Sequence, residues 1–247
     1  MTVPVAGKVE SLFIKVRRGE AMVQRAALAC ASGLGIAGDI HANRLSPRQM
    51  LITLQSELNI LALAPGALFE NMVISLADPR SFRPGTAIVT GCGVEIRLTM
   101  YCEPCKRILP VVGDLRAMLR RRGILGYIVS GGEIRTGDAI NVIPGKYPAL
   151  PESPAQKFRD FVPTIPLGKV VRYLDVTIGI GVDSSFVRAL PGYVRRNAGD
   201  LVPMHRIVNA QGRLLDYLPG QAAKLISEGV RVDSSGAVDL MQFLWQG

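Results

Sequence analysis

A segment rich in proline and glycine, VIPGKYPALPESPAQKF (residues 142–158), separates two halves of the chain with different hydrophobic patterns. Such a composition is typical of a semi-rigid linker. The 247 residues are enough for one large domain or two modest ones. We therefore predict a first domain over residues 1–145, a linker over 146–154 and a second domain over 155–247.

The first half is predicted to be mainly β. Alternating apolar residues between glycine turns run through KVESLFIKV, AIVTGCGVEIRLTM and GYIVSGGEIRTGDAINVI. Two segments are expected to be helical, SPRQMLITLQSELNILAL (46–63) and GDLRAMLRRRG (113–123). Many short strands with few helices indicate a β-barrel-like fold.

The second half is predicted to be mainly α. Asp183 is expected to cap the N-terminus of a helix over 184–197. That helix and the one before it, joined by IGVDS, fit a helix-turn-helix with a small wing, as in winged-helix folds. The expected elements are helices over 153–165, 171–181, 184–197 and 219–230, the last ended by Gly229, and a strand over 203–215 with a turn at NAQG.

Charge does not distinguish a nucleic-acid-binding protein from a basic enzyme, and hydropathy gives no membrane span. The net charge is +9, and residues 155–247 hold 11 Lys and Arg against 8 Asp and Glu. A basic chain attracts nucleic acid and other polyanions, but a basic soluble enzyme has the same charge. No apolar run approaches the roughly 20 residues of a membrane span, and no signal peptide is evident. We expect a cytoplasmic protein that does not bind membranes.

All four cysteines, Cys30, Cys92, Cys102 and Cys105, lie in the first half. The motif CEPC (102–105) places two thiols at a spacing that suits a redox pair or two zinc ligands. A zinc site needs two more ligands, and there is no second CxxC motif. A thioredoxin-type centre expects a βαβ context, which is absent. Two cysteines packed at a strand end remain an alternative.

The first half resembles the MOSC domain, which is named after the C-terminal part of molybdenum cofactor sulfurases. The matching segments are GLGIAGDIHA (33–42), RQMLI (48–52), FEN (69–71), RPG (83–85), GCGVEI (91–96), CEPCKRI (102–108), RRGILGYIVSGG (121–132) and GDAI (137–140). The resemblance implies a β-barrel-like fold and a cysteine that carries sulfur as a persulfide or ligates molybdenum. Cys105 matches that cysteine, and Cys102 matches an additional cysteine of some members.

The resemblance also implies a molybdenum cofactor, molybdenum or pyridoxal phosphate binding, and a cysteine desulfurase as sulfur donor. Lys106 and Arg107 would lower the pKa of the Cys105 thiol, and a thiolate is a soft ligand that suits molybdenum. Asp39, His41, Arg121 and Arg122 become candidate cofactor-binding residues. On the residues alone, Asp39 and His41 also fit a turn and a polar rim, and the arginines fit a solvated helix face.

The string PMHRIV (203–208) has a second resemblance. In order with IPLGKVVRYLDVTIGIG (165–181), VRALPGYVRRN (187–197) and EGVRV (228–232), it resembles the DNA-binding domain of alkylguanine-DNA alkyltransferases. Repair-active members have Pro-Cys-His-Arg, and their cysteine takes the alkyl group from O6 of guanine with help from His and Glu. Here His205, Arg206 and Glu228 match, but Met204 replaces the cysteine.

A thioether has no proton to lose and cannot become a thiolate, so alkyl transfer by this mechanism is excluded. What remains is similar to the alkyltransferase-like proteins, which flip out an alkylated guanine and mark it for other repair machinery. Met204 would line the alkyl pocket with His205, Arg206 and Glu228. The implied partners are double-stranded DNA and nucleotide excision repair proteins.

The same resemblance assigns roles in nucleotide flipping. Arg188 would enter the base stack, Tyr173 would rotate the phosphate, and Arg195 and Arg196 would contact DNA. Asn197 matches an asparagine that braces the active-site turn. The ordinary alternatives are a solvated arginine, a half-buried tyrosine and a helix C-cap, and we favour a structural role for Asn197. Pro191 is expected to kink the recognition helix because it removes an amide donor.

We therefore predict a DNA-binding, alkyltransferase-like protein that recognises alkylated or otherwise modified guanine without alkyl transfer. It is fused to a MOSC domain with sulfur-carrier or molybdenum chemistry. The alternative is a MOSC enzyme or sulfur carrier that acts on small molecules, with a degenerate interaction module as its second half.

Overall fold

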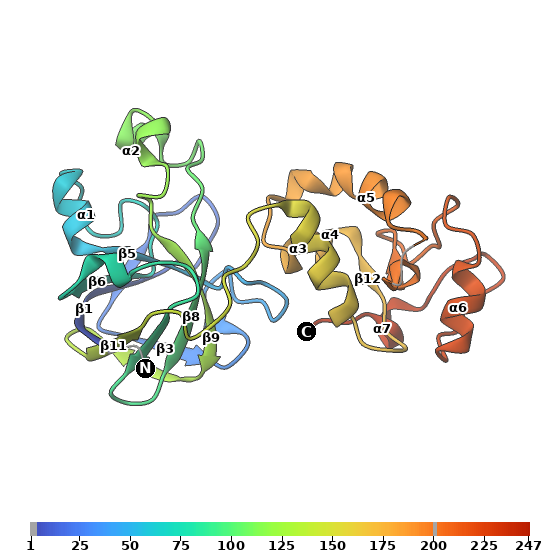
Figure 1. The fold of residues 1–247 in the computed structure, drawn as a ribbon, viewed down its shortest axis with the longest axis horizontal. Coiled ribbons are helices and arrows are strands. Elements are labelled where there is room, and N and C mark those ends of the chain that lie inside the picture. Colours follow the sequence, from blue (N-terminus) through green and yellow to red (C-terminus); the bar gives the residue numbers. More distant parts are fainter. Residues whose placement is uncertain (1–3, 200–201) are drawn as a thin grey trace. The chain divides into compact units, whose positions relative to one another are not determined.

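The computed structural model describes residues 4–199 and 202–247. The chain forms two compact units, Met1–Leu150 and Pro151–Gly247 (Figure 1). The first is built mainly from strands and the second mainly from short helices, so the predicted fold classes are confirmed.

Seven strands close the first unit into a barrel. Each strand pairs with the next around the barrel, and the pairing of β11 with β1 completes it. All of these pairs are antiparallel except β5 with β6. In order the strands are β1 (Val5–Ile14), β6 (Met72–Leu76), β5 (Met50–Leu54), β9 (Ile124–Ser130), β8 (Glu95–Tyr101), β7 (Ala87–Thr90) and β11 (Ala139–Ile143).

Shorter elements surround the barrel. Strand β2 (Val23–Arg25) extends the sheet beyond β1. A separate sheet has the order β10 (Gly132–Arg135), β3 (Ala27–Ala31) and β4 (Gly35–Ile36). The helical pieces are α1 (Gln55–Ile60), α2 (Leu109–Val112) and the 3-10 turns η1 (Pro79–Ser81) and η2 (Arg116–Met118).

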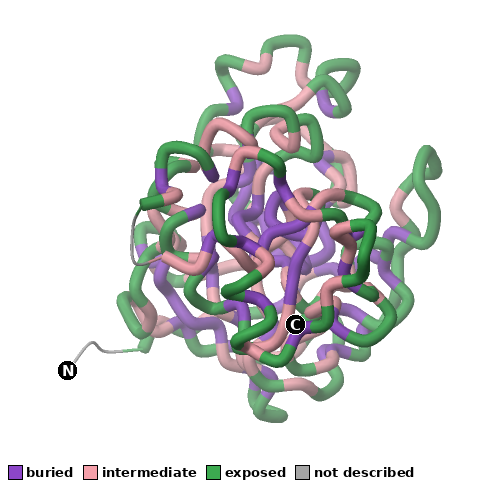
Figure 2. Tube along the Cα trace, turned by 90° about the vertical axis from the view of Figure 1, so that its right-hand side faces the viewer, coloured by how far each residue is buried: buried purple, intermediate pink, exposed green. Residues whose placement is uncertain are grey.

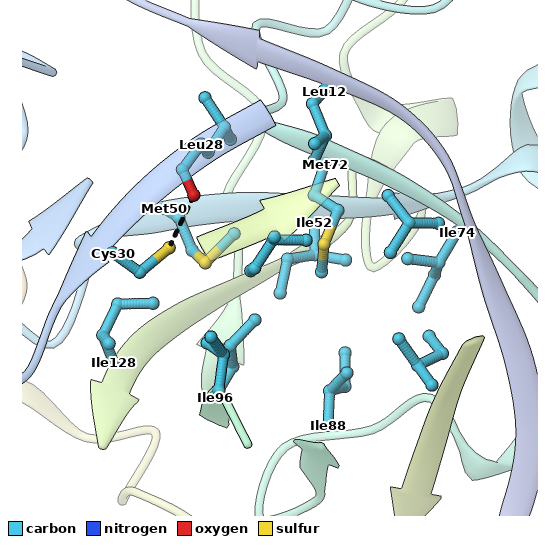
Figure 3. Close-up of a cluster of buried hydrophobic side chains, with 14 of the residues drawn as sticks. Leu12, Leu28, Cys30, Met50, Ile52, Met72, Ile74, Ile88, Ile96 and Ile128 are labelled. Atoms are coloured by element: carbon cyan, nitrogen blue, oxygen red, sulfur yellow. Dashed lines mark hydrogen bonds between the residues drawn. The ribbon is translucent and has the colours of Figure 1, made fainter. Parts of the chain in front are cut away.

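The barrel interior is filled by aliphatic and sulfur-containing side chains. Figure 3 shows Leu12, Met50, Ile52, Met72, Ile74, Ile88, Ile96 and Ile128 pointing into this space from different strands. Most of them are completely buried. Because the interior is packed with side chains, chemistry in this unit has to lie at a rim or on a connection between strands.

The helix predicted over 46–63 is mostly wrong. Residues Met50–Leu54 form β5, and only α1 at Gln55–Ile60 is helical. Every residue of MLITL is buried, so the run carries no periodicity that distinguishes a strand from a buried helix. The helix predicted over 113–123 shrinks to η2, because Gly113, Arg120 and Gly123 all have positive φ.

The second unit contains the expected helices in shorter form. Asp183 caps the segment as predicted, since its side chain accepts a hydrogen bond from the Ser185 amide. The elements are α3 (Pro154–Phe161), η3 (Val162–Thr164), β12 (Val171–Arg172), α4 (Tyr173–Gly179), η4 (Ser184–Ala189), α5 (Leu190–Arg196), η5 (Met204–Arg206), β13 (Ile207–Val208), α6 (Gln221–Ser227) and α7 (Leu240–Phe243).

The strand predicted over 203–215 is also wrong in most of its length. Met204–Arg206 form the 3-10 turn η5, β13 pairs in parallel with β12, and Arg213 forms an isolated bridge with Ala237. Parallel pairing over two residues ties the turn to the start of α4. The α6 prediction holds, and Gly229 follows its C-cap with a φ of 80° that suits glycine.

Pro191 does not kink the recognition helix. The segment before it, η4, is a 3-10 helix, and α5 begins at Leu190 with Pro191 in its first turn. The first amides of a helix have no partner within it, so proline loses nothing there. The expected kink is replaced by a change of helix type at this point.

The start of the predicted linker is attached to the first unit. The Tyr147 amide donates to the Gly85 carbonyl at 2.9 Å, and Arg97 donates to the Pro148 carbonyl at 2.7 Å. Lys146 forms an ion pair with Glu95 at 2.6 Å. Residues 146–148 are therefore held against strand β8 rather than acting as free spacer.

None of the helices in residues 4–199 and 202–247 has both the length and the apolar character needed to cross a bilayer.

Gly179 sets the distance between α4 and α3. A Cβ atom there would lie 2.1 Å from Phe161 Cε2. We expect Gly179→Ala to lower the stability of the second unit by about 1–3 kcal/mol, because the aromatic ring must move. Urea unfolding of the full chain measures this. Gly192→Ala in α5 is the matched control, since its Cβ meets only the mobile Arg196 guanidinium and should stabilise by up to about 1 kcal/mol. Equal effects of both changes would contradict the packing role of Gly179.

Candidate functional site

Met204 lies at the start of turn η5, inside the core of the second unit. It is 2 % exposed and packs in one cluster with Leu190, Val194 and Leu218. A cavity of about 20 Å³ adjoins it, which is room for one water molecule. The cavity is lined by Ala198, Val202, Met204, His205, Leu218, Pro219, Gln221 and Lys224. The thioether therefore occupies most of the space at this position.

The Glu228 carboxylate, at the C-terminus of α6, gathers three groups around it. His205 Nε2 lies 2.7 Å from Oε1, and Arg206 donates to both carboxylate oxygens over 2.8–3.1 Å. The Gly168 amide donates to Oε2 at 3.2 Å. Arg206 also donates to the Ile165 carbonyl at 2.6 Å. The structure thus brings together His205, Arg206 and Glu228, as the sequence predicts.

Electrostatics keep this carboxylate charged. Burial alone would raise the pKa of Glu228, but the hydrogen bonds from Arg206, His205 and the Gly168 amide lower that pKa to about 2. A carboxylate saturated in this way orients the His205 ring and fixes turn η5. Beside a thiol it would support deprotonation, but beside the Met204 thioether there is no proton to remove.

Gln221 holds the backbone of turn η5 and of β13, and sequence reasoning missed it. Its Nε2 donates to the His205 and Ile207 carbonyls at 3.0 and 2.7 Å. Its Oε1 accepts from the Leu215 amide at 2.7 Å, and the side chain is buried. A glutamine at the first position of a helix gives no such signal in the sequence, because its partners lie 6 to 16 residues away.

Tyr173 opens α4, and its hydroxyl is hydrogen-bonded to the Tyr217 hydroxyl. Burial and this bond raise the pKa of Tyr173, so its phenol stays protonated. The Arg195 guanidinium lies 4.5 Å from the centre of the Tyr217 ring. Tyr217 was not among the predicted site residues, yet it connects Tyr173 to Arg195.

The predicted DNA-contacting arginines are exposed. Arg188 lies in η4, just before α5, and its side chain forms no hydrogen bond or ion pair within the described part of the chain. Arg195 and Arg196 occupy the last turn of α5, where Arg196 stacks 4.8 Å from the Tyr193 ring. All three side chains are thus open to a ligand on the surface that carries the helix-turn-helix.

Asn197 has a structural position. It is the C-cap of α5 and is buried. Its side chain accepts from Arg159 at 2.9 Å and donates to the Tyr193 carbonyl at 2.7 Å. It therefore ties α5 to α3, and these contacts do not include the turn at Met204.

In the first unit, Cys105 meets Arg122. Arg122 Nη1 donates to Cys105 Sγ at 3.2 Å and to the Glu103 carbonyl at 2.8 Å. Arg122 is buried, and its Nε has no hydrogen-bond partner among the described residues. Partial burial opposes ionisation of Cys105, but the Arg107 amide and the charges of Arg122 and Arg107 lower the pKa of the thiol. Arg122 thus does part of what was predicted for Lys106.

The remaining predicted residues of this unit fall into other clusters. Cys102 is buried, and its burial raises its pKa. Asp39 Oδ1 lies 2.8 Å from His41 Nδ1, and Asp39 Oδ2 accepts from Asn71 at 2.9 Å. Arg121 donates to Glu57 at 3.0 Å, so its charge is already paired.

Two further acceptors in this area were missed from the sequence. Asn71 and Glu70, both in the FEN segment, are buried. Burial raises the pKa of Glu70, which accepts from the Gly66 and Leu68 amides. No group of three or more His, Cys, Asp or Glu side chains suited to a metal ion occurs within residues 4–199 and 202–247.

Comparison with known proteins places the second unit. Residues 154–230 match the family model of the 6-O-methylguanine DNA methyltransferase DNA-binding domain. A DNA base-flipping protein of Escherichia coli K12 is 34% identical over 94 residues, which are 36% of this chain and 72% of that protein. The chain belongs to this DNA-binding family. Within the family, Met204 at the nucleophile position makes it alkyltransferase-like.

Solved structures add the fold of the first unit. The YuaD protein of Bacillus subtilis is 24% identical with a TM-score of 0.51, covering 57% of this chain and 98% of that one. This likeness shows a MOSC-type barrel fold. The alkyltransferase-like protein Atl1 of S. pombe, solved with damaged DNA containing O6-carboxymethylguanine, is 25% identical with a TM-score of 0.35. It covers 40% of this chain and 99% of that one.

Because of Glu228, we expect the free energy of unfolding of the second unit to fall as the pH is lowered. The folded pKa of Glu228 is below its ordinary value of 4.5, so the stabilisation is complete above about 4.5 and is lost as the pH falls toward about 2. Glu228→Gln should cost about 3 kcal/mol at neutral pH, because Arg206 loses the anion that it pairs with in a partly buried site, and should flatten this dependence. Urea unfolding at several pH values measures it. The exposed Asp216→Asn is the control; an unchanged acid profile in Glu228→Gln would refute the assignment.

Proposed function

We propose that the second unit binds double-stranded DNA containing O6-alkylguanine or a similar modified base, extrudes that nucleotide and holds it without alkyl transfer. The single observation that carries the proposal is the position of Met204. It lies in turn η5 beside an intact network of His205, Arg206 and Glu228, so the geometry around a nucleophile is present while the nucleophile is absent.

The surface next to this turn supports nucleotide flipping. Extruding a base costs a few kcal/mol of lost stacking and pairing, which an inserted side chain and phosphate contacts offset. Arg188 is exposed and forms no ion pair with described residues, so it can enter the base stack. Arg195 and Arg196 are exposed in the last turn of α5 and would contact phosphates. The family match and the name of the Escherichia coli relative support DNA binding by this unit.

The cavity next to Met204 holds only about 20 Å³, so the base has to displace neighbouring groups on entry. Val202, Leu218 and Pro219 form its apolar wall, and the polarizable thioether of Met204 would contact the alkyl group. The bound lesion would then mark the site for repair proteins, with nucleotide excision repair as the natural class. The modest positive charge of this half implies binding that weakens with salt.

The lesion preference is tested by titrating the full chain with matched duplexes that contain guanine or O6-methylguanine. We expect tighter binding of the modified duplex and about a tenfold loss of that preference in Arg188→Ala, because the space left by the flipped base stays empty. Arg231→Ala removes a charge from the same unit and should weaken both complexes equally. If the unmodified protein bound both duplexes with equal affinity, the proposed recognition of the modified base would be wrong.

Met204→Cys tests whether the network is still arranged for transfer. A thiolate at this position would attack the alkyl carbon, forming a C–S bond while the bond to O6 breaks and guanine leaves with the electron pair. We expect slow, single-turnover gain of one alkyl group, detected by intact mass after incubation with the modified duplex. Met204→Ser is the control. A cysteine variant that binds the lesion yet stays unalkylated would mean that His205 and Glu228 only hold the turn.

A second function, in the first unit, is favoured by the contact between Cys105 and Arg122. We propose that Cys105 carries sulfur as a persulfide, with a cysteine desulfurase as donor. The same residues fit a molybdenum cofactor: Cys105 offers a soft thiolate, and the Nε of buried Arg122, which has no partner among the described residues, offers a donor to an anion. When bound, that cofactor would supply redox chemistry. Cofactor binding, pyridoxal phosphate binding and location in the cytoplasm stay predictions.

A further inference from the structure

The connection between strands β8 and β9 is far longer than its geometry requires. Tyr101 and Ile124 are paired across the two antiparallel strands, and the Cys102 amide donates to the Gly123 carbonyl at 2.9 Å. Two residues can join such a pair. Here residues 102–123 intervene, and we call them the Cys105 lobe. The lobe contains α2 and η2 and is an insertion well beyond the usual length of a connection between paired strands.

The Cys105 lobe is anchored on one side and open on the other. Ile108 and Met118 are buried in a core cluster with Phe13, Leu58 and Leu68. On the outer side Leu109, Val111 and Leu119 are 41 %, 42 % and 65 % exposed. The lobe, which carries α2, projects from the barrel of the first unit (Figure 1), and most of it is exposed (Figure 2).

Positive charge is concentrated on the same lobe. It contains six Lys and Arg against two Asp and Glu, so it carries +4 of the chain's +9. Arg121 and Arg122 are used inside the unit. Lys106, Arg107 and Arg116 are exposed and form no ion pair within the part of the chain that the structure describes.

We infer that the Cys105 lobe is the docking surface for an acidic protein that delivers sulfur to Cys105. The inference rests on the sulfur chemistry proposed above. The exposed cations Lys106, Arg107 and Arg116 favour an acidic partner, and their charge raises the rate at which that partner associates with the lobe. Three exposed aliphatic side chains favour a protein, because a phosphate backbone offers nothing to bury against leucine or valine.

Transfer of sulfur to Cys105 needs no reactant other than the Cys105 thiolate and the donor's persulfide. The Cys105 thiolate attacks the outer sulfur of the donor's persulfide, and the donor's S–S bond breaks. The donor leaves as a thiolate, and Cys105 keeps the sulfur with its proton as a persulfide. Such an attack needs the donor's cysteine at contact distance from half-buried Cys105, which is why the surrounding surface has to fit the donor.

The test uses the full chain, a cysteine desulfurase with cysteine as its sulfur source, and inorganic polysulfide as a donor without protein. Persulfide on Cys105 is followed by intact mass, with Cys105→Ser as the blank. We expect Arg116→Glu to slow transfer from the desulfurase about fivefold at low salt and much less at high salt. Leu119→Ser should slow it at both. Both variants should load normally from polysulfide.

Arg83→Glu is the matched control, since Arg83 is exposed outside the lobe, and it should behave as the unmodified protein. Transfer from the desulfurase that is insensitive to both lobe variants would overturn the inference. So would an Arg116→Glu variant that loses duplex DNA binding but transfers sulfur normally, which would assign the lobe to phosphates. Absence of persulfide from either donor would instead reject the sulfur chemistry of Cys105, and the docking role with it.

Discussion

The carboxylate of Glu228 is the interaction on which the second unit depends. It joins the end of α6, the turn η5 and the loop before β12 through His205, Arg206 and the Gly168 amide. A partly buried anion with this many donors is held in place, because each donor loses its partner if the anion moves. The position of Met204 follows from it, since the next two residues along the chain are both held.

The second unit keeps the residues that would orient a nucleophile but has no thiol for them to act on. The groups that would orient a nucleophile persist, whereas the sulfur they would serve has no acidic proton. The first unit differs in this respect, because Cys105 is a thiol whose pKa is lowered and whose sulfur accepts a hydrogen bond from Arg122. One chain thus combines a sulfur that cannot become a thiolate, in Met204, with a thiol whose pKa is lowered, in Cys105.

The sequence predicted what depends on regular patterns and failed where tertiary packing decides. Alternation identified β1, β8 and β11 because exposed or half-buried residues alternate with buried ones over much of each strand. It missed β5, which is buried at every position. Pro191 was expected to bend a helix, but the chain begins α5 one residue earlier and places it in the first turn.

For the sites, the ordered motifs named His205, Arg206 and Glu228 as one group, and the structure brings these three side chains into contact. Gln221 and Tyr217 could not be found that way. Their partners are distant in sequence, and neither residue type stands out in its local context. Arg122 was noticed as a charge, but only the fold shows that its guanidinium reaches the thiol.

The burial of Met204 gives the second unit a chemical property of its own. Thioethers are oxidised to sulfoxides by reagents that reach them, and a sulfoxide is too polar for an apolar cluster. At 2 % exposure, Met204 meets such reagents only when the turn opens. The rate at which the Met204 sulfur is oxidised therefore measures how often the pocket opens in the absence of DNA.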